Sequence, residues 1–135
     1  FLGNWYGQVL KERNALNYID IVIPVPLHKK RLKKRGYNQV SGFAQRIADH
    51  LNASYMEHIL IKTANTRTQT KKNRLYRWRG MPDLYKVTHP EILCNKNVLL
   101  IDDVITTGAT IEACARAIKK VKDVSVSVAA MAVVP

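Results

Sequence analysis

The chain of 135 residues is long enough for one compact domain, which at this size buries about two-thirds of the surface that the unfolded chain exposes. Its formal net charge is +12, with 22 lysines and arginines against 10 aspartates and glutamates, and this balance favours a polyanionic partner. The apolar runs are only strand-sized, and no leader sequence is recognisable, so we expect a cytoplasmic, soluble protein with no membrane span.

The first half of the chain alternates between helical and strand patterns. Apolar residues at helical spacing predict an amphipathic helix over residues 1–12, and residues 20–26 read as a buried strand that two prolines end. An apolar stripe predicts a helix over residues 40–51, and residues 55–61 read as the next strand.

The second half continues this alternation after a basic stretch. Residues 62–79 show no clean period, so they form either a long loop or a helix that forms conditionally. Residues 97–102 then read as a strand, the stripe from Ile111 to Val121 predicts a helix, and residues 124–133 close the chain as an apolar strand.

Alternating strands and helices predict βαβ units around a parallel sheet, with right-handed crossovers. We therefore expect an α/β fold in one domain over residues 1–135, in which residues 1–19 form a leading helix and linker and residues 20–135 form the core. The two cysteines, Cys94 and Cys114, are too far apart for a C-x-x-C motif, so buried thiols are expected and neither a disulfide nor a metal cage is indicated.

The segment from Val98 to Thr110 joins an apolar strand, two adjacent carboxylates and a hydroxyl-rich turn. In a parallel sheet, such a strand delivers Asp102 and Asp103 to the carboxyl edge, where open α/β folds collect their ligands. A carboxylate pair can accept hydrogen bonds from the vicinal hydroxyls of a ribose. The structural alternative is an acid pair that caps the following turn.

The turn after the acids has the properties of a phosphate site. A predicted helix begins behind it, where unpaired backbone N–H groups and the helix dipole favour an anion, and a glycine permits positive φ. An ordinary helix start with a threonine cap is the alternative, and both can hold at once. No lysine follows as in a P-loop, so an ATPase motif is excluded. The turn residues are Thr106, Thr107, Gly108, Ala109 and Thr110.

The same segment resembles the fingerprint that binds phosphoribosyl pyrophosphate (PRPP) in type I phosphoribosyltransferases, including the acid pair and the TTGAT turn. A second stretch, Ile23 to His28 followed by Arg31 and by Arg35 to Gln39, is similar to the ComF/GntX branch of competence-associated phosphoribosyltransferase-like proteins. The resemblance covers residues 20–135 and implies a type I phosphoribosyltransferase-like fold, with a mostly parallel central sheet flanked by helices.

The resemblance implies that pyrophosphate is displaced from the anomeric carbon of PRPP, with Mg²⁺ bound on the pyrophosphate and an acceptor that the sequence does not identify. Asp102 and Asp103 are expected to bind the ribose hydroxyls and to be catalytic. They would lie in the water shell of Mg²⁺, because this ion keeps most of its waters and takes oxygens from substrate. Members of the family often carry an amino-terminal four-cysteine zinc module, which this sequence does not supply. A homodimer is consistent with such enzymes.

Two further groups of residues take their roles from the resemblance. The loop after the first strand would bind pyrophosphate through main-chain N–H groups and nearby cations; its residues are Pro26, Leu27, His28, Arg31 and Arg35. The basic stretch corresponds to the flexible loop that closes over PRPP, with Arg67 as a catalytic cation; its residues are Arg67, Thr68, Gln69, Arg74 and Arg77. After these arginines, Gly80-Met81-Pro82 departs from the expected continuation.

Two functions remain open at the level of sequence. The first is an enzyme, a phosphoribosyltransferase of unknown acceptor. The second is a non-catalytic accessory protein of DNA uptake that binds PRPP, a nucleotide or single-stranded DNA. Two clusters that hold 13 of the 22 basic residues support it: residues 29–35, and seven cations between Lys62 and Arg79. Trp78, which lies among the arginines, also suits base stacking.

Overall fold

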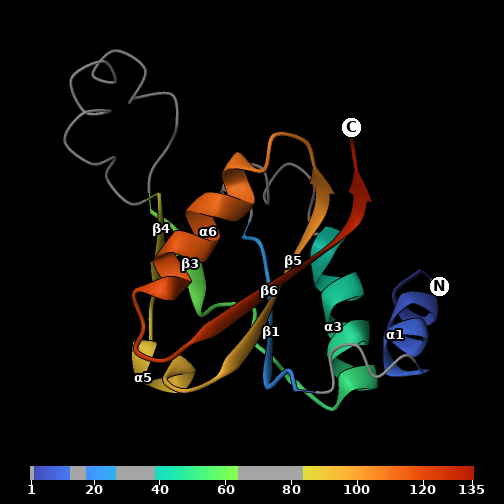
Figure 1. Cartoon of the computed structure of the whole chain (residues 1–135), viewed down its shortest axis with the longest axis horizontal. Coiled ribbons are helices and arrows are strands. Elements are labelled where there is room, and N and C mark those ends of the chain that lie inside the picture. The colour runs from blue at the N-terminus through green and yellow to red at the C-terminus, as the bar shows by residue number, and fades with distance from the viewer. Residues whose placement is uncertain (1, 13–17, 27–38, 64–83) are drawn as a thin grey trace.

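A central sheet of four parallel strands organises the fold (Figure 1). The structure is a computed structural model, and it describes residues 2–12, 18–26, 39–63 and 84–135. The strands lie in the order β2 (Ser54–Tyr55), β1 (Ile21–Pro24), β5 (Asn97–Ile105) and β6 (Ser125–Val133). The expected α/β class with a parallel sheet is thereby confirmed. Within the described ranges, no helix is long and apolar enough to cross a bilayer.

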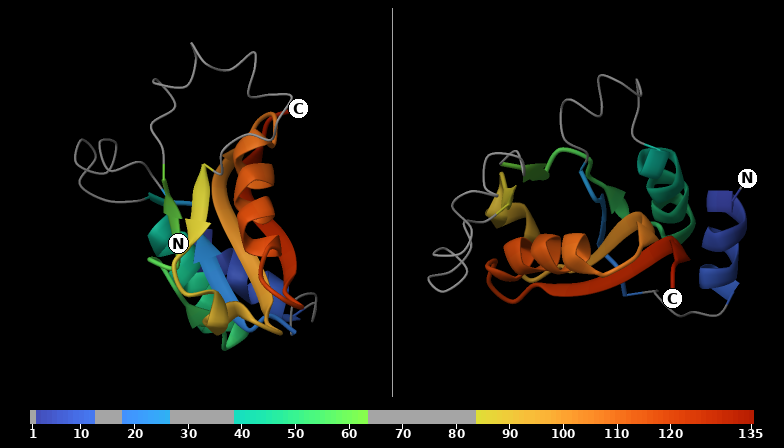
Figure 2. Two further views of the ribbon diagram at one scale, coloured as in Figure 1. Left: turned by 90° about the vertical axis from the view of Figure 1, so that its left-hand side faces the viewer. Right: turned by 90° about the horizontal axis from the view of Figure 1, so that it is seen from above.

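The two central strands are apolar on both faces because helices cover both sides of the sheet. On one face, Val22, Leu99 and Ile101 pack with the apolar stripe of α3 (Gln39–Leu51). On the other face, Ile23 and Leu100 pack against α6 (Ala109–Lys119). Figure 2 shows these two helices on opposite sides of the sheet.

Helix α1 (Leu2–Glu12) forms an outer layer on α3, as its amphipathic pattern predicts. The rings of Tyr6 and Phe43 lie 5.6 Å apart at an angle of 33°. Glycines allow this approach, because a Cβ on Gly7 would lie 2.6 Å from the ring of His50. The predicted leading helix is therefore present, and it contacts the domain through α3.

The predicted strand over residues 55–61 is wrong, because this stretch divides between two sheets. Its start belongs to β2, and its end belongs to β3 (Leu60–Lys62), which pairs antiparallel with β4 (Tyr85–Val87). The backbone turns away after Tyr55, where Met56 N–H still donates to the Val22 carbonyl at 3.0 Å. Strand β4 and the short helix α5 (Pro90–Leu93) were not predicted from the sequence.

The small sheet of β3 and β4 packs beside α6 and closes that side of the core. The buried side chains of Leu60 and Tyr85 join the same apolar cluster as Leu100 and Ile118. The Thr63 N–H donates to the Leu84 carbonyl at 2.8 Å, so the ends of the two strands are held together. Residues 64–83, which contain most of the second basic cluster, lie outside the described residues.

Candidate functional site

The acid pair lies within β5, near the carboxyl end of the sheet. The predicted strand over residues 97–102 is confirmed and continues to Ile105, so both acids have extended backbone instead of beginning the turn. Asp102 is paired with Ala130 of β6 and is only 8% exposed. Asp103 is half-buried. Two consecutive strand residues point to opposite faces, so the carboxylates flank the strand end.

Each acid accepts one backbone hydrogen bond from the residue that follows it. The Asp103 N–H donates to Oδ1 of Asp102 at 2.8 Å, and the Val104 N–H donates to Oδ1 of Asp103 at 2.7 Å. Burial raises the pKa of Asp102 to about 6; the hydrogen bond from Asp103 N–H opposes this rise and the nearby Asp103 carboxyl adds to it. A carboxylate kept from water in this way interacts strongly with hydroxyl donors.

The turn between β5 and α6 has the geometry of an anion site. Gly108 adopts a left-handed conformation with φ of 81°, immediately before α6 begins at Ala109. The Thr107 hydroxyl accepts the Ala109 N–H at 3.3 Å, and α6 starts with the bond from Glu112 N–H to the Gly108 carbonyl at 2.9 Å. The preceding amides of the first helical turn have no carbonyl four residues earlier within the helix. The Ala109 amide among them already donates to Thr107, so the amides of Thr110 and Ile111 are the ones that the helix start offers to an anion.

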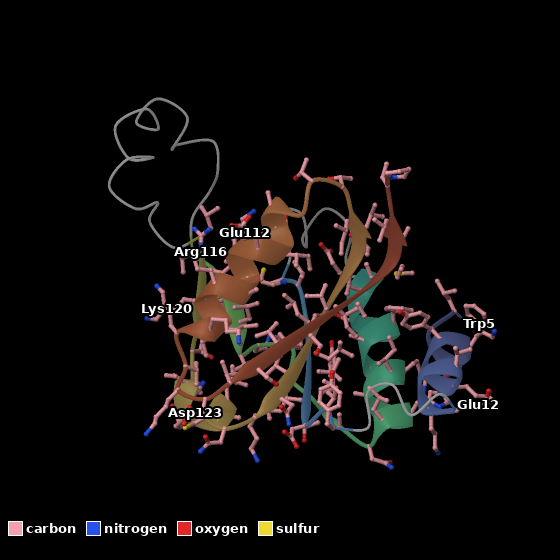
Figure 3. All side chains as sticks on the ribbon, in the orientation of Figure 1. Trp5, Glu12, Glu112, Arg116, Lys120 and Asp123 are labelled. Atoms are coloured by element: carbon pink, nitrogen blue, oxygen red, sulfur yellow. The ribbon has the colours of Figure 1, made fainter. Side chains whose placement is uncertain are left out.

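The acid and the turn line the same small hollow, about 30 Å³ in volume. Its lining consists of Asp102 and residues 104–111, which include all five predicted turn residues. The only acid in the first turn of α6, Glu112, is paired with Arg116 at 2.8 Å on the flank of the helix (Figure 3). Its charge is thus partly compensated next to the helix start.

Strand β1 brings the start of the predicted pyrophosphate loop beside the acids. The Val25 N–H donates to the Ile101 carbonyl at 2.8 Å, one residue before Asp102, and Pro26 follows directly. The other predicted residues of this loop lie outside the described part of the chain: Leu27, His28, Arg31 and Arg35. The same holds for the predicted flexible-loop residues: Arg67, Thr68, Gln69, Arg74 and Arg77.

Sequence reasoning missed a buried group behind Asp102. Tyr85 of β4 is 5% exposed, and its hydroxyl interacts with the thiol of Cys114 in α6. Burial raises the pKa of Cys114 to about 12, with the charge of Asp102 contributing, and burial likewise raises the pKa of Tyr85. Lys62 lies over the Tyr85 ring at 5.9 Å. The alternation of Tyr85, Lys86 and Val87 could have indicated β4.

The acid pair offers oxygen donors of the kind that Mg²⁺ binds. Both acids supply hard oxygen donors, and each has only one of its oxygens engaged by the hydrogen bonds described above. Among the described residues there is no group of three or more histidines, cysteines, aspartates or glutamates that could hold a metal ion.

This chain is similar to known proteins both in sequence and in fold. Residues 40–134 match the protein family described as the phosphoribosyl transferase domain. Competence protein F of Haemophilus influenzae is 28% identical over 111 residues, which cover 82% of this chain and 48% of that protein. Competence protein ComFC of Bacillus subtilis is 35% identical over 108 residues, which cover 79% of this chain and 42% of that protein. The chain therefore spans less than half the length of these curated relatives.

A solved structure with a similar fold is the glutamine PRPP amidotransferase of B. subtilis, complexed with ADP and GMP. Its TM-score is 0.66 at 20% sequence identity, and the match covers 96% of this chain and 26% of that one. At this level of identity the likeness concerns the fold. Together with the relatives named as competence proteins, it confirms the resemblance drawn from the two sequence motifs.

Proposed function

Because the chain belongs to the phosphoribosyl transferase domain family, we propose that it binds PRPP with Mg²⁺ and transfers the phosphoribosyl group to an acceptor. The observation that carries this proposal is the shared hollow of Asp102 and the 104–111 turn. In a ribose 5-phosphate, the two vicinal hydroxyls are on ring carbons, and the 5′-phosphate is on the exocyclic carbon attached to the same ring. The hollow itself, at about 30 Å³, admits only a small group, but the carboxylate and the turn that line it are close enough to contact different groups of one such ligand.

In the proposed complex, the turn binds the 5′-phosphate through first-turn amides and threonine hydroxyls. Asp102 and Asp103 accept hydrogen bonds from the ribose hydroxyls and orient the ring. The acceptor forms a bond to the anomeric carbon as the bond to pyrophosphate breaks, and pyrophosphate leaves with the electron pair. The anionic acids also favour the positive charge that develops on the ring. When bound, magnesium supplies neutralising charge for pyrophosphate.

Calorimetric titration of PRPP, with and without Mg²⁺, tests the binding step. We expect Mg²⁺-dependent binding to the unaltered chain and none to Asp102→Asn/Asp103→Asn. A matched control is Asp49→Asn/Asp123→Asn, which removes two exposed carboxylates and leaves the site intact. Unchanged affinity in the Asp102/Asp103 variant would refute the assignment of these acids. A complete lack of binding at millimolar PRPP would refute the proposal.

Turnover is tested separately from binding, by release of pyrophosphate in the presence of candidate acceptors. An enzyme releases pyrophosphate only with its acceptor, whereas a binding protein holds PRPP without consuming it. If binding is present and no acceptor in a broad panel of bases and amines supports release, the non-catalytic alternative is favoured.

Charge favours single-stranded nucleic acid as the second candidate ligand. The net charge of +12 suits a polyanion, and several relatives are named DNA utilization proteins, such as YhgH of Escherichia coli. The test is the salt dependence of binding to an oligonucleotide, which should become shallower when Lys71, Lys72 and Arg74 are replaced by alanine. An unchanged salt dependence would show that these three residues do not bind DNA.

A further inference from the structure

Strand β6 forms one edge of the main sheet, and among the described strands it pairs only with β5. It crosses the front of the sheet in Figure 1, with no described helix or strand in front of it. The Ser125 N–H donates to the Lys96 carbonyl, on the β5 side, over 3.0 Å. Successive residues of a strand direct their backbone groups to opposite sides, so those of Val126, Val128 and Ala130 face outward. The outer side of β6 is therefore a row of hydrogen-bonding groups that suits a further strand.

The side chains along β6 are uncharged, and several apolar ones are exposed. No charged residue occurs between Ser125 and Pro135. The exposed fractions of Val128, Met131 and Val133 are 43%, 39% and 67%. Natural sheets commonly protect an open edge from pairing by a very short strand, a proline or a lysine. Strand β6 is nine residues long and contains none of these protections, which indicates an interaction surface.

The other described strand edges do carry such protection. Strand β2, at the opposite edge of the main sheet, has only two residues. Strands β3 and β4 have three residues each and contain Lys62 and Lys86. Within the part of the chain that the structure describes, β6 is thus the one long, uncharged edge. A symmetric contact between two copies would use this same strand from each.

We propose that two copies of this chain associate through antiparallel pairing of their β6 strands. A two-fold axis normal to the sheet brings the outward backbone groups of one strand opposite those of the other and joins the two four-stranded sheets. Apolar side chains then lie beside apolar side chains, and the paired strands bury no charge. An acidic or basic partner would gain no ion pair on this strand, so a second copy is the occupant that the edge fits.

The proposed geometry also keeps the basic surfaces of the two copies apart. The net charge of +12 opposes association. In an antiparallel pair, Lys122 before one β6 lies at least about 30 Å from its counterpart, which is several Debye lengths at physiological salt. A strand about 30 Å long in a sheet about 10 Å thick gives a footprint of about 300 Å² per copy. This area is small for a specific interface, so we expect a weak dimer.

Sedimentation velocity of the full chain without PRPP, from low to high micromolar concentration, tests the association. We expect monomer to convert to dimer with rising concentration, and the dimer to become stronger at higher salt because repulsion is screened. Met131→Lys places a charge on the paired edge and should raise the dissociation constant at least about tenfold. The matched variant Ile92→Lys adds the same charge in α5, at a residue that is likewise 39% exposed, and should change the constant less than about twofold.

Hydrogen exchange on the unaltered chain locates the contact. The amides of Val126, Val128 and Ala130 should exchange more slowly at high than at low protein concentration, whereas the Ser125 amide, which already bonds within the sheet, should not change. A chain that stays monomeric, a dimer that salt weakens, equal effects of the two lysine variants, or association without added protection of the outward amides would each overturn the proposal. Since PRPP is absent, these outcomes are independent of the proposed function.

Discussion

The backbone N–H of Asp103 donates to the buried carboxyl of Asp102 over 2.8 Å, so one acid of the pair is held by the main chain of the other. This bond supports the ionised form of Asp102, yet the cost of burial is larger and raises its pKa to about 6. The site therefore holds a carboxylate at neutral pH, although its burial in the fold disfavours the charged form.

We expect Asp102→Asn to stabilise the fold near neutral pH. The pKa of Asp102 rises from 3.8 to about 6 on folding, so the cost of the buried charge is fully present above pH 6 and is relieved as the pH falls toward 3.8. Removing the charge should raise the free energy of unfolding at neutral pH by about 1–2 kcal/mol. Urea unfolding at neutral pH and near pH 4 measures this, and the difference should shrink at the lower pH.

The control for this substitution is Asp123→Asn, at an exposed residue with φ of 55°, a conformation that asparagine also adopts readily. Its stability should stay within about 0.5 kcal/mol of the unaltered chain. An Asp102→Asn protein that is less stable at neutral pH would show that the carboxylate contributes net stability to the fold.

PRPP affinity should depend on the ionisation of Asp102, if the proposed function holds. Below about pH 6 the carboxyl is protonated and loses part of its capacity to accept ribose hydroxyls, so affinity should weaken by up to about tenfold per pH unit. Calorimetry between pH 5 and 8 measures the profile. Pyrophosphate, which lacks the ribose, reports the protonation of the ligand's own phosphates, and parallel profiles for the two ligands would contradict the prediction.

Two glycines should respond in opposite directions when they are replaced by alanine. Gly42 lies within α3 with nothing within 4 Å of the added Cβ, so Gly42→Ala should stabilise the helix by about 0.5–1 kcal/mol. The Cβ of Gly7→Ala would meet the His50 ring at 2.6 Å, so α1 should shift away from α3 at a cost of about 1–3 kcal/mol. Thermal unfolding of the two variants measures both effects, and equal shifts would contradict this packing of α1.

The two cysteines should differ in reactivity toward a thiol reagent. Cys114 is fully buried, and burial raises its pKa to about 12, so it carries almost no thiolate at pH 8. Cys94 is partly exposed and should react first. Titration with a chromogenic disulfide should release one equivalent quickly and the second only after denaturant is added. The Cys94→Ala variant should lose the fast phase, and its persistence would contradict the burial of Cys114.

The pattern of residues predicted those elements whose apolar spacing was long and regular. Helix α3 and strand β5 were found in this way, and the acids with their turn were located because residue types in fixed order carry chemical meaning. The division of residues 55–61 between two sheets could not be predicted, since three-residue strands are fixed by tertiary pairing and not by local pattern.

The surroundings of Asp102 also could not be predicted from the sequence pattern. Tyr85 and Cys114 are far from the acid in sequence, and a cysteine on a helical stripe predicts burial without naming its neighbours. The pKa of Asp102 depends on these packing contacts and on the strand continuing past it to Ile105. The burial and the pKa of Asp102 are therefore set by tertiary packing, which the local sequence pattern does not specify.

The order of the strands also constrains when the site can form. Strand β1 lies at the centre of the sheet, but its partner β5 follows far along the chain: Asp20 and Asn97, which share a hydrogen bond at the base of this pair, are separated by 77 residues. Pairing across such a distance closes a large loop and is slow. During synthesis, the acids, the turn and their covering strand β6 therefore acquire their geometry only as the last quarter of these 135 residues emerges, so the binding site is completed late in folding.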